Sequence, residues 1–142
     1  MIWSTESSAI RLNFALVVEE KERLRSSIVT LLRERGWLVH GISRAEQAFV
    51  ILAHIPYSLI ILDSELPGIG GGGLARIIRN SGDWRPVRLV VITSSEAQTV
   101  ATGLAQCGAI LVRRSRWQED LDGCLSDCQG NPKTTSNCSQ AQ

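Results

Sequence analysis

The sequence predicts an α/β fold in which a doubly wound parallel sheet, with strand order 2-1-3-4-5, carries helices on both faces. Two observations indicate this class. Five short apolar segments alternate with five segments whose apolar residues recur at helical spacing. Most of the apolar segments are continuous, which is typical of strands that are buried on both sides in a parallel sheet. Ligands of such sheets bind beyond the carboxyl ends of the strands, where the order reverses between strands one and three.

Each predicted strand is a short apolar run that ends at a polar residue or a turn. The first run stops at Glu19 and Glu20. The third has four aliphatic residues in succession and ends on Asp63, and the fourth ends on Thr93. The five predicted strands span residues 14–18, 37–41, 58–62, 88–92 and 109–112.

The first two helices are bounded by capping residues. Residues 21–35 are predicted as the first helix, with Gly36 at the C-cap position. A capping box of Ser43 and Glu46 opens the second helix, which continues to about His54 and ends before Pro56.

The third helix follows a glycine-rich loop at 68–73. Glycine costs up to about 1 kcal/mol per helical position relative to alanine, so we expect this helix to begin late, near Leu74, and to be the least stable unit. The fourth helix is predicted at 96–106, and the last one opens at Ser115 and Gln118. The core-facing residues of the last helix are Trp117, Leu121, Cys124, Leu125 and Cys128.

The length of 142 residues allows one ordinary domain, which we place at 12–128. Residues 1–11 show no apolar pattern and are interpreted as an N-terminal extension. Residues 129–142 contain almost nothing to bury, which predicts a disordered tail.

Composition limits the class of partner. The formal net charge is +1 and the arginines are dispersed, which argues against a nucleic-acid surface. No apolar stretch approaches the roughly 18 residues of a membrane span, and the N-terminus lacks a signal-peptide pattern. The four cysteines form no Cys-x-x-Cys pair, which argues against a zinc site. We therefore expect a cytoplasmic protein that binds neither nucleic acid nor membrane.

Charged and hydroxyl side chains gather at the carboxyl edge of the predicted sheet. They are Glu19, Glu20, Asp63, Thr93 and either Arg113 or Arg114. Neighbouring carboxylates repel one another unless a hard cation lies among them, and ligands that are all oxygen suit Mg²⁺. The pattern therefore predicts a metal site. The alternative is that the first two acids only cap the helix that follows them, where negative charge interacts favourably with the helix dipole.

Four motifs at these strand ends resemble the receiver domain of bacterial two-component response regulators, which has a flavodoxin-like (βα)5 fold. They are Val-Val-Glu-Glu at 17–20, Leu-Asp-Ser-Glu-Leu-Pro-Gly at 62–68, Val-Ile-Thr-Ser at 91–94 and Gly-Ala at 108–109. The resemblance covers about residues 12–127. The spacing from the acidic pair to Asp63, and from Asp63 to Thr93, agrees with the family.

The resemblance implies that Asp63 accepts a phosphoryl group from a histidine kinase or a phosphotransfer protein. It implies that Glu19 and Glu20 bind Mg²⁺ together with Asp63, and that Glu65 supplies a backbone carbonyl to the metal. The hydroxyl group of Thr93 would meet the phosphoryl oxygens. Domains of this family act as signalling modules rather than as enzymes.

Three positions depart from the family pattern. Arg113 is the best match to the lysine that the family places after the fifth strand, with Arg114 as the alternative. Both Glu19 and Glu20 are glutamate where at least one aspartate is usual, so weakened Mg²⁺ binding is expected. Ile110 stands in place of an aromatic switch residue.

The first hypothesis is a stand-alone receiver that is phosphorylated on Asp63 and signals through a downstream protein partner. The tail is too short and polar for a DNA-binding unit, so signalling through a partner protein is expected. The candidate surface for docking or for a homodimer is formed by the helix predicted at 96–106, the strand at 109–112 and the last helix. The alternative is a pseudo-receiver, an interaction module that takes no phosphoryl group. A second alternative is a flavodoxin-like cofactor binder that uses the Gly-x-Gly-x-x-Gly pattern at 68–73. That match is weak because a dinucleotide fingerprint follows the first strand, not the third.

Overall fold

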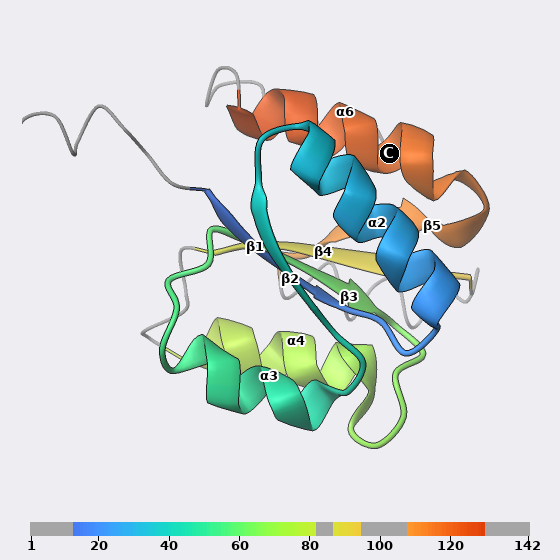
Figure 1. Cartoon of the computed structure of the whole chain (residues 1–142). Coiled ribbons are helices and arrows are strands. Elements are labelled where there is room, and N and C mark those ends of the chain that lie inside the picture. The colour runs from blue at the N-terminus through green and yellow to red at the C-terminus, as the bar shows by residue number, and fades with distance from the viewer. Residues whose placement is uncertain (1–12, 82–86, 95–107, 130–142) are drawn as a thin grey trace, which may run out of the picture.

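Five parallel strands form the sheet, in the predicted order β2-β1-β3-β4-β5 (Figure 1). They are β1 (Phe14–Val18), β2 (Leu38–Ile42), β3 (Leu59–Asp63), β4 (Arg88–Thr93) and β5 (Ile110–Arg113). The computed structural model describes residues 13–81, 87–94 and 108–129. Each strand boundary lies within one residue of its predicted position.

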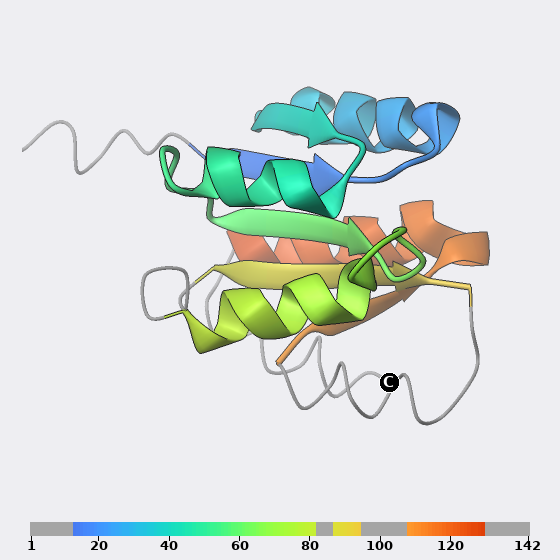
Figure 2. The same cartoon turned by 90° about the horizontal axis from the view of Figure 1, so that it is seen from below.

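Helices cover both faces of the sheet. They are α2 (Glu22–Glu34), α3 (Ala45–Leu52), α4 (Gly70–Asn80) and α6 (Trp117–Gln129), with a 3-10 turn at Arg114–Arg116. The pair α2 and α6 lies on one face and the pair α3 and α4 on the other (Figures 1 and 2). The helix predicted at 96–106 lies outside the described residues, as do the predicted extension at 1–11 and, apart from the last residue of α6, the predicted tail. No helix in the described part of the chain has the length and apolar character to cross a membrane.

The core consists of two apolar clusters, one on each side of the sheet. In β3, Ile60 and Leu62 pack with the α3 and α4 side, whereas Leu59 and Ile61 pack with the α2 and α6 side. Successive residues of a strand point to opposite faces. Because both faces are covered by helices, every residue of β3 is buried, which accounts for the continuous apolar run in the sequence.

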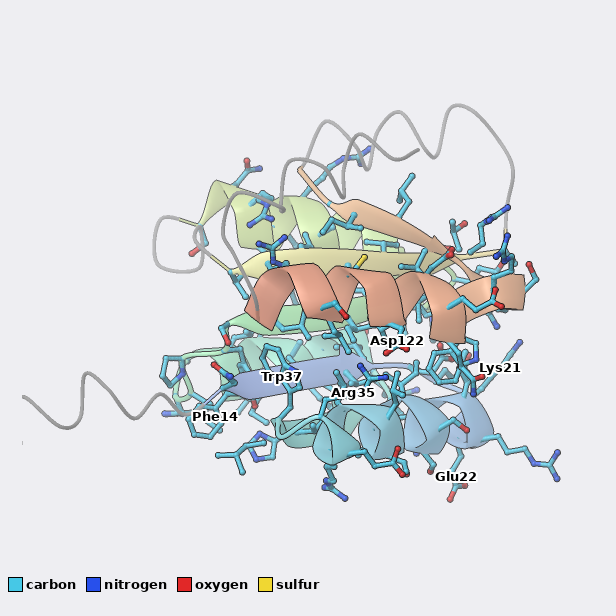
Figure 3. All side chains as sticks on the ribbon, turned by 90° about the horizontal axis from the view of Figure 1, so that it is seen from above. Phe14, Lys21, Glu22, Arg35, Trp37 and Asp122 are labelled. Carbon is cyan, nitrogen blue, oxygen red and sulfur yellow. The ribbon has the colours of Figure 1, made fainter. Side chains whose placement is uncertain are left out.

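An ion pair joins α2 to α6 on one face of the sheet. Figure 3 shows Arg35, which directly follows α2, next to Asp122 of α6, and their side chains form a salt bridge. Trp37 is buried in the same apolar cluster as Leu121 of α6. The salt bridge and this shared apolar cluster join α6 to the same face of the sheet as α2, directly after the 3-10 turn that links α6 to β5.

The second helix is capped by a different residue from the one predicted. The expected box of Ser43 and Glu46 is wrong, because the side-chain oxygen of Gln47 accepts hydrogen bonds from the backbone N–H groups of Ser43 and Arg44, at 3.2 and 3.1 Å. The helix therefore begins at Ala45, and its N-cap is Arg44, one residue later than the predicted cap. A glutamine at this position satisfies the same unpaired N–H groups as a glutamate would.

The helix α4 begins earlier than predicted, at Gly70 rather than near Leu74. Its first turn is pressed against the end of β3. A Cβ atom at Gly71 would lie 2.1 Å from the backbone oxygen of Asp63. Helical propensity alone argued for a late start, but only glycine permits this close approach of helix and strand.

Candidate functional site

Three polar side chains are buried in the described part of the chain, and all three lie at the carboxyl edge of the sheet. Glu19 follows β1, Asp63 is the last residue of β3, and Thr93 is the last residue of β4. Their exposed fractions are 1%, 4% and 8%. Burying charged and hydroxyl groups costs free energy unless they have partners. A cluster of this kind therefore indicates a site rather than a packing arrangement.

The carboxylate of Asp63 is held at both oxygens. Its Oδ1 accepts a hydrogen bond from the backbone N–H of Glu65 at 3.0 Å. Its Oδ2 accepts one from Nη2 of Arg114 at 2.6 Å, which is also an ion pair. In addition, the backbone N–H of Ser64 donates to the carbonyl of Ile92 at 2.8 Å, which ties the end of β3 to β4. The side chain is thus fixed at the strand end with a guanidinium group beside it.

The cation beside Asp63 is Arg114, and the preference for Arg113 was wrong. Arg113 is the last residue of β5, and its side chain is 62% exposed and pairs with Asp120 of α6 at 3.7 Å. Arg114 is the first residue of the 3-10 turn, and its side chain is only 21% exposed. The reason is local: the chain leaves the strand at Arg113, and the turn that follows directs the second arginine to the site.

Glu19 and Asp63 share one electrostatic environment. Burial, together with the neighbouring Asp63 carboxyl group, raises the pKa of Glu19 to about 7. Burial alone would raise the pKa of Asp63 as well, but the neighbouring Glu19 carboxyl group, the backbone N–H of Glu65 and the guanidinium group of Arg114 outweigh it and hold the pKa of Asp63 below its ordinary value. Asp63 is therefore the ionised member of the pair, which suits a nucleophile.

One oxygen of the site has no hydrogen-bond partner. Oε2 of Glu19 accepts a hydrogen bond from the backbone N–H of Lys21 at 2.9 Å, but Oε1 is buried without a hydrogen-bond partner. A buried, unpartnered carboxylate oxygen beside a second carboxylate fits a hard cation such as Mg²⁺. The side chain of Glu20 is exposed, and no three acidic, histidine or cysteine side chains in the described part converge as a metal cluster. Glu19 and Asp63 are therefore the two buried carboxyl groups at the expected site, and the side chain of Glu20 lies outside this buried cluster.

The side chain of Glu65 has a role that the sequence did not reveal. Its Oε2 accepts a hydrogen bond from the hydroxyl of Ser94, and its Oε1 lies 3.9 Å from Nη2 of Arg114. The resemblance assigned Glu65 only a backbone carbonyl and assigned Ser94 nothing. The available signal was that Ser94 directly follows Thr93 at a strand end.

The glycine-rich loop serves the site by packing. Gly68 and Gly70 have φ values of 77° and 78°, which other residues rarely adopt. Gly71 lies against the backbone of Asp63, as described above. The backbone conformation thus accounts for the first two glycines of the Gly-x-Gly-x-x-Gly pattern, and packing accounts for Gly71, which is at one of its x positions.

Comparison with known proteins identifies the family. A family model described as the response regulator receiver domain matches residues 15–112, which is more than half of the chain. The chain belongs to the response regulator receiver family. The predicted fold and the resemblance of the four strand-end motifs are thereby confirmed.

Related receivers occur at the level of both sequence and structure. The two-component response regulator PhoP of Pseudomonas aeruginosa is 33% identical over 108 residues, which cover 76% of this chain and 39% of that protein. A probable transcriptional regulatory protein of Picosynechococcus is 30% identical over 92 residues, or 60% of this chain and 37% of that protein. The receiver thus spans less than half the length of these two curated relatives.

Solved receivers share the fold at lower identity. A response regulator receiver protein from Pseudomonas putida superposes with a TM-score of 0.76 at 21% identity, covering 83% of this chain and 98% of that one. The chemotaxis response regulator CheY4 of Vibrio cholerae gives 0.68 at 15% identity, covering 92% and 98%. The receiver identity favours a signalling module over the cofactor-binding alternative.

Proposed function

We propose that this receiver takes a phosphoryl group on Asp63 from a histidine kinase or a phosphotransfer protein and signals through contacts with a downstream protein. The observation that supports it best is the pair of Asp63 and Arg114 at the carboxyl edge of the sheet. An ionised, buried carboxylate with a cation at 2.6 Å has both the nucleophile and the positive charge that phosphoryl transfer needs. Thr93 supplies a hydroxyl group on the neighbouring strand.

The reaction requires little covalent work from the protein. An oxygen of Asp63 forms a bond to phosphorus while the bond from phosphorus to the donor's imidazole nitrogen breaks, and its electron pair returns to that nitrogen. Arg114 shifts from the carboxylate to a phosphoryl oxygen, and the hydroxyl group of Thr93 donates a hydrogen bond to another. Each contact replaces water around a group that gains negative charge.

Mg²⁺ is proposed as the cofactor, held by Glu19 and Asp63 with the backbone carbonyl of Glu65. When bound, it would neutralise charge on the phosphoryl oxygens. Glutamate in place of aspartate lengthens the reach of the first ligand, which supports the expectation of weak binding.

The signal follows from the movement of Thr93. This residue ends β4, so its rearrangement toward a phosphoryl oxygen changes the chain that continues from that strand. We propose the surface around β5 and α6 as the docking face, either for a downstream protein or for a second copy. The proposed setting is the cytoplasm, with no role for nucleic acid or membrane.

Intact-mass analysis tests the proposal. The purified chain is incubated with acetyl phosphate and MgCl₂, and its mass is compared with that of Asp63→Asn. The wild-type chain is expected to gain one phosphoryl group and the variant none. Loss of the adduct when the metal is chelated would support the cofactor assignment. A wild-type chain without an adduct would instead indicate a pseudo-receiver, and an adduct on Asp63→Asn would move the acceptor elsewhere.

A further inference from the structure

The side chain of Glu65 bridges two strand ends beside the phosphoacceptor. Ser94, which directly follows β4, donates a hydrogen bond to Oε2 of Glu65. Arg114, which directly follows β5, lies 3.9 Å from Oε1 of the same carboxylate. Because the backbone N–H of Glu65 also donates to Asp63 at 3.0 Å, this residue is anchored beside the nucleophile at both its backbone and its side chain.

The guanidinium group of Arg114 lies between two carboxylates, those of Asp63 and Glu65. Its Nη2 contacts Asp63 at 2.6 Å and Glu65 at 3.9 Å, whereas its Nε is buried without a hydrogen-bond partner. A guanidinium group offers several donors in a planar fork and grips a phosphoryl group best with two of them. The Glu65 carboxylate therefore competes with an incoming phosphoryl group for the same cation.

We propose that the Glu65 side chain is a gate over Asp63 that slows anionic phosphodonors and releases Ser94 once Asp63 is phosphorylated. The proposal rests on the proposed function of Asp63 as phosphoacceptor. Before transfer, the gate adds one negative charge to the path of a donor and occupies Arg114. After transfer, the negative charge of the phosphoryl group repels the Glu65 carboxylate, and Arg114 pairs with the phosphoryl group instead. Ser94 then loses its acceptor, next to Thr93, so both residues that follow Ile92 change partners together.

The charge of Glu65 is only partly buried, since its side chain is 52% exposed. Its repulsion of a donor therefore acts through solvent and is weakened by salt. Removing the charge is expected to accelerate phosphorylation by acetyl phosphate by about three- to tenfold at low ionic strength. The acceleration should shrink at high salt and with phosphoramidate, which carries less negative charge than acetyl phosphate at neutral pH.

Glu65→Gln is the main test, because glutamine keeps the length and can still accept from Ser94 but has no charge. Ser94→Ala is the second variant, since it frees the carboxylate without removing it. Glu119→Gln is the matched control: it removes the same charge from an exposed side chain of α6 that pairs with Arg116. The rate of the phosphoryl mass increase is measured for all three and for the wild type, with both donors and at two salt concentrations.

The gate predicts that Glu65→Gln is fastest, that Ser94→Ala lies between it and the wild type, and that Glu119→Gln equals the wild type. Equal rates for the wild type and Glu65→Gln would overturn the gate and leave Asp63 as phosphoacceptor. An acceleration that is the same for both donors, or that Glu119→Gln also shows, would overturn it too. Absence of an adduct on every variant, Glu65→Gln included, would overturn the phosphoacceptor function and the gate with it.

Discussion

Substitution of Gly71 tests whether the first turn of α4 is pressed onto the phosphoacceptor strand. In Gly71→Ala, the new Cβ atom would lie 2.1 Å from the carbonyl oxygen of Asp63 and 2.8 Å from its carbonyl carbon and from Cα of Ser64. All three neighbours are backbone atoms, so no side chain can move away. Overpacking costs about 3 kcal/mol, and alanine regains about 1 kcal/mol of helical propensity. The expected net loss in the free energy of unfolding is therefore about 2 kcal/mol.

Gly73→Ala is the matched control in the same helix. Its Cβ atom would lie 3.4 Å from Cβ of Ile69, an ordinary van der Waals contact. Only the gain in helical propensity remains, so this variant should be more stable than the wild type by up to about 1 kcal/mol. Urea denaturation followed by circular dichroism measures both. Equal stabilisation by the two substitutions would refute the close approach of α4 to Asp63.

Three further predictions probe the fold and the site. The folded chain holds a proton on Glu19 up to its pKa of about 7, whereas the unfolded chain releases this proton near the ordinary value of 4.5. The free energy of unfolding of the metal-free protein should therefore fall as pH rises between these two pKa values, by up to about 3 kcal/mol. Glu19→Gln should remove that part of the pH dependence; an unchanged profile would contradict it. Gln47→Ala should cost about 1 kcal/mol in urea unfolding and Glu46→Ala less, since only Gln47 caps the backbone; the opposite ranking would restore the predicted capping box. Arg35→Ala should cost less than about 1 kcal/mol, with the loss reduced in high salt, because the ion pair to α6 is partly exposed; a larger, salt-independent loss would point to another role.

The acidic and hydroxyl residues of the site could be located from the sequence because strand ends are readable in it. A continuous apolar run that stops at Asp63 or Thr93 marks the carboxyl end of a buried strand. The parallel topology then places these ends together without any knowledge of side-chain contacts. The structure accordingly has Glu19, Asp63 and Thr93 buried at one edge.

The cation could not be chosen in the same way. Arg113 and Arg114 are neighbours of the same type, and which of them reaches Asp63 depends on where β5 ends and how the next turn is directed. The contact of Glu65 with Ser94 is tertiary in the same sense, since the two residues lie on loops after different strands. The start of α4 was mispredicted because helical propensity contains no information about the strand that the helix approaches.

The rate of phosphorylation of Arg113→Gln and Arg114→Gln tests most directly the claim that Asp63 and Arg114 form a phosphoacceptor site. Both variants lose one positive charge, from neighbouring residues, but Arg114 contacts Asp63, whereas Arg113 pairs with Asp120. With acetyl phosphate and MgCl₂, Arg114→Gln is expected to be phosphorylated about a hundredfold more slowly than the wild type. Arg113→Gln is expected to be phosphorylated at the same rate as the wild type. A slow Arg113→Gln beside a normal Arg114→Gln, or equal rates in the two variants, would contradict the site described.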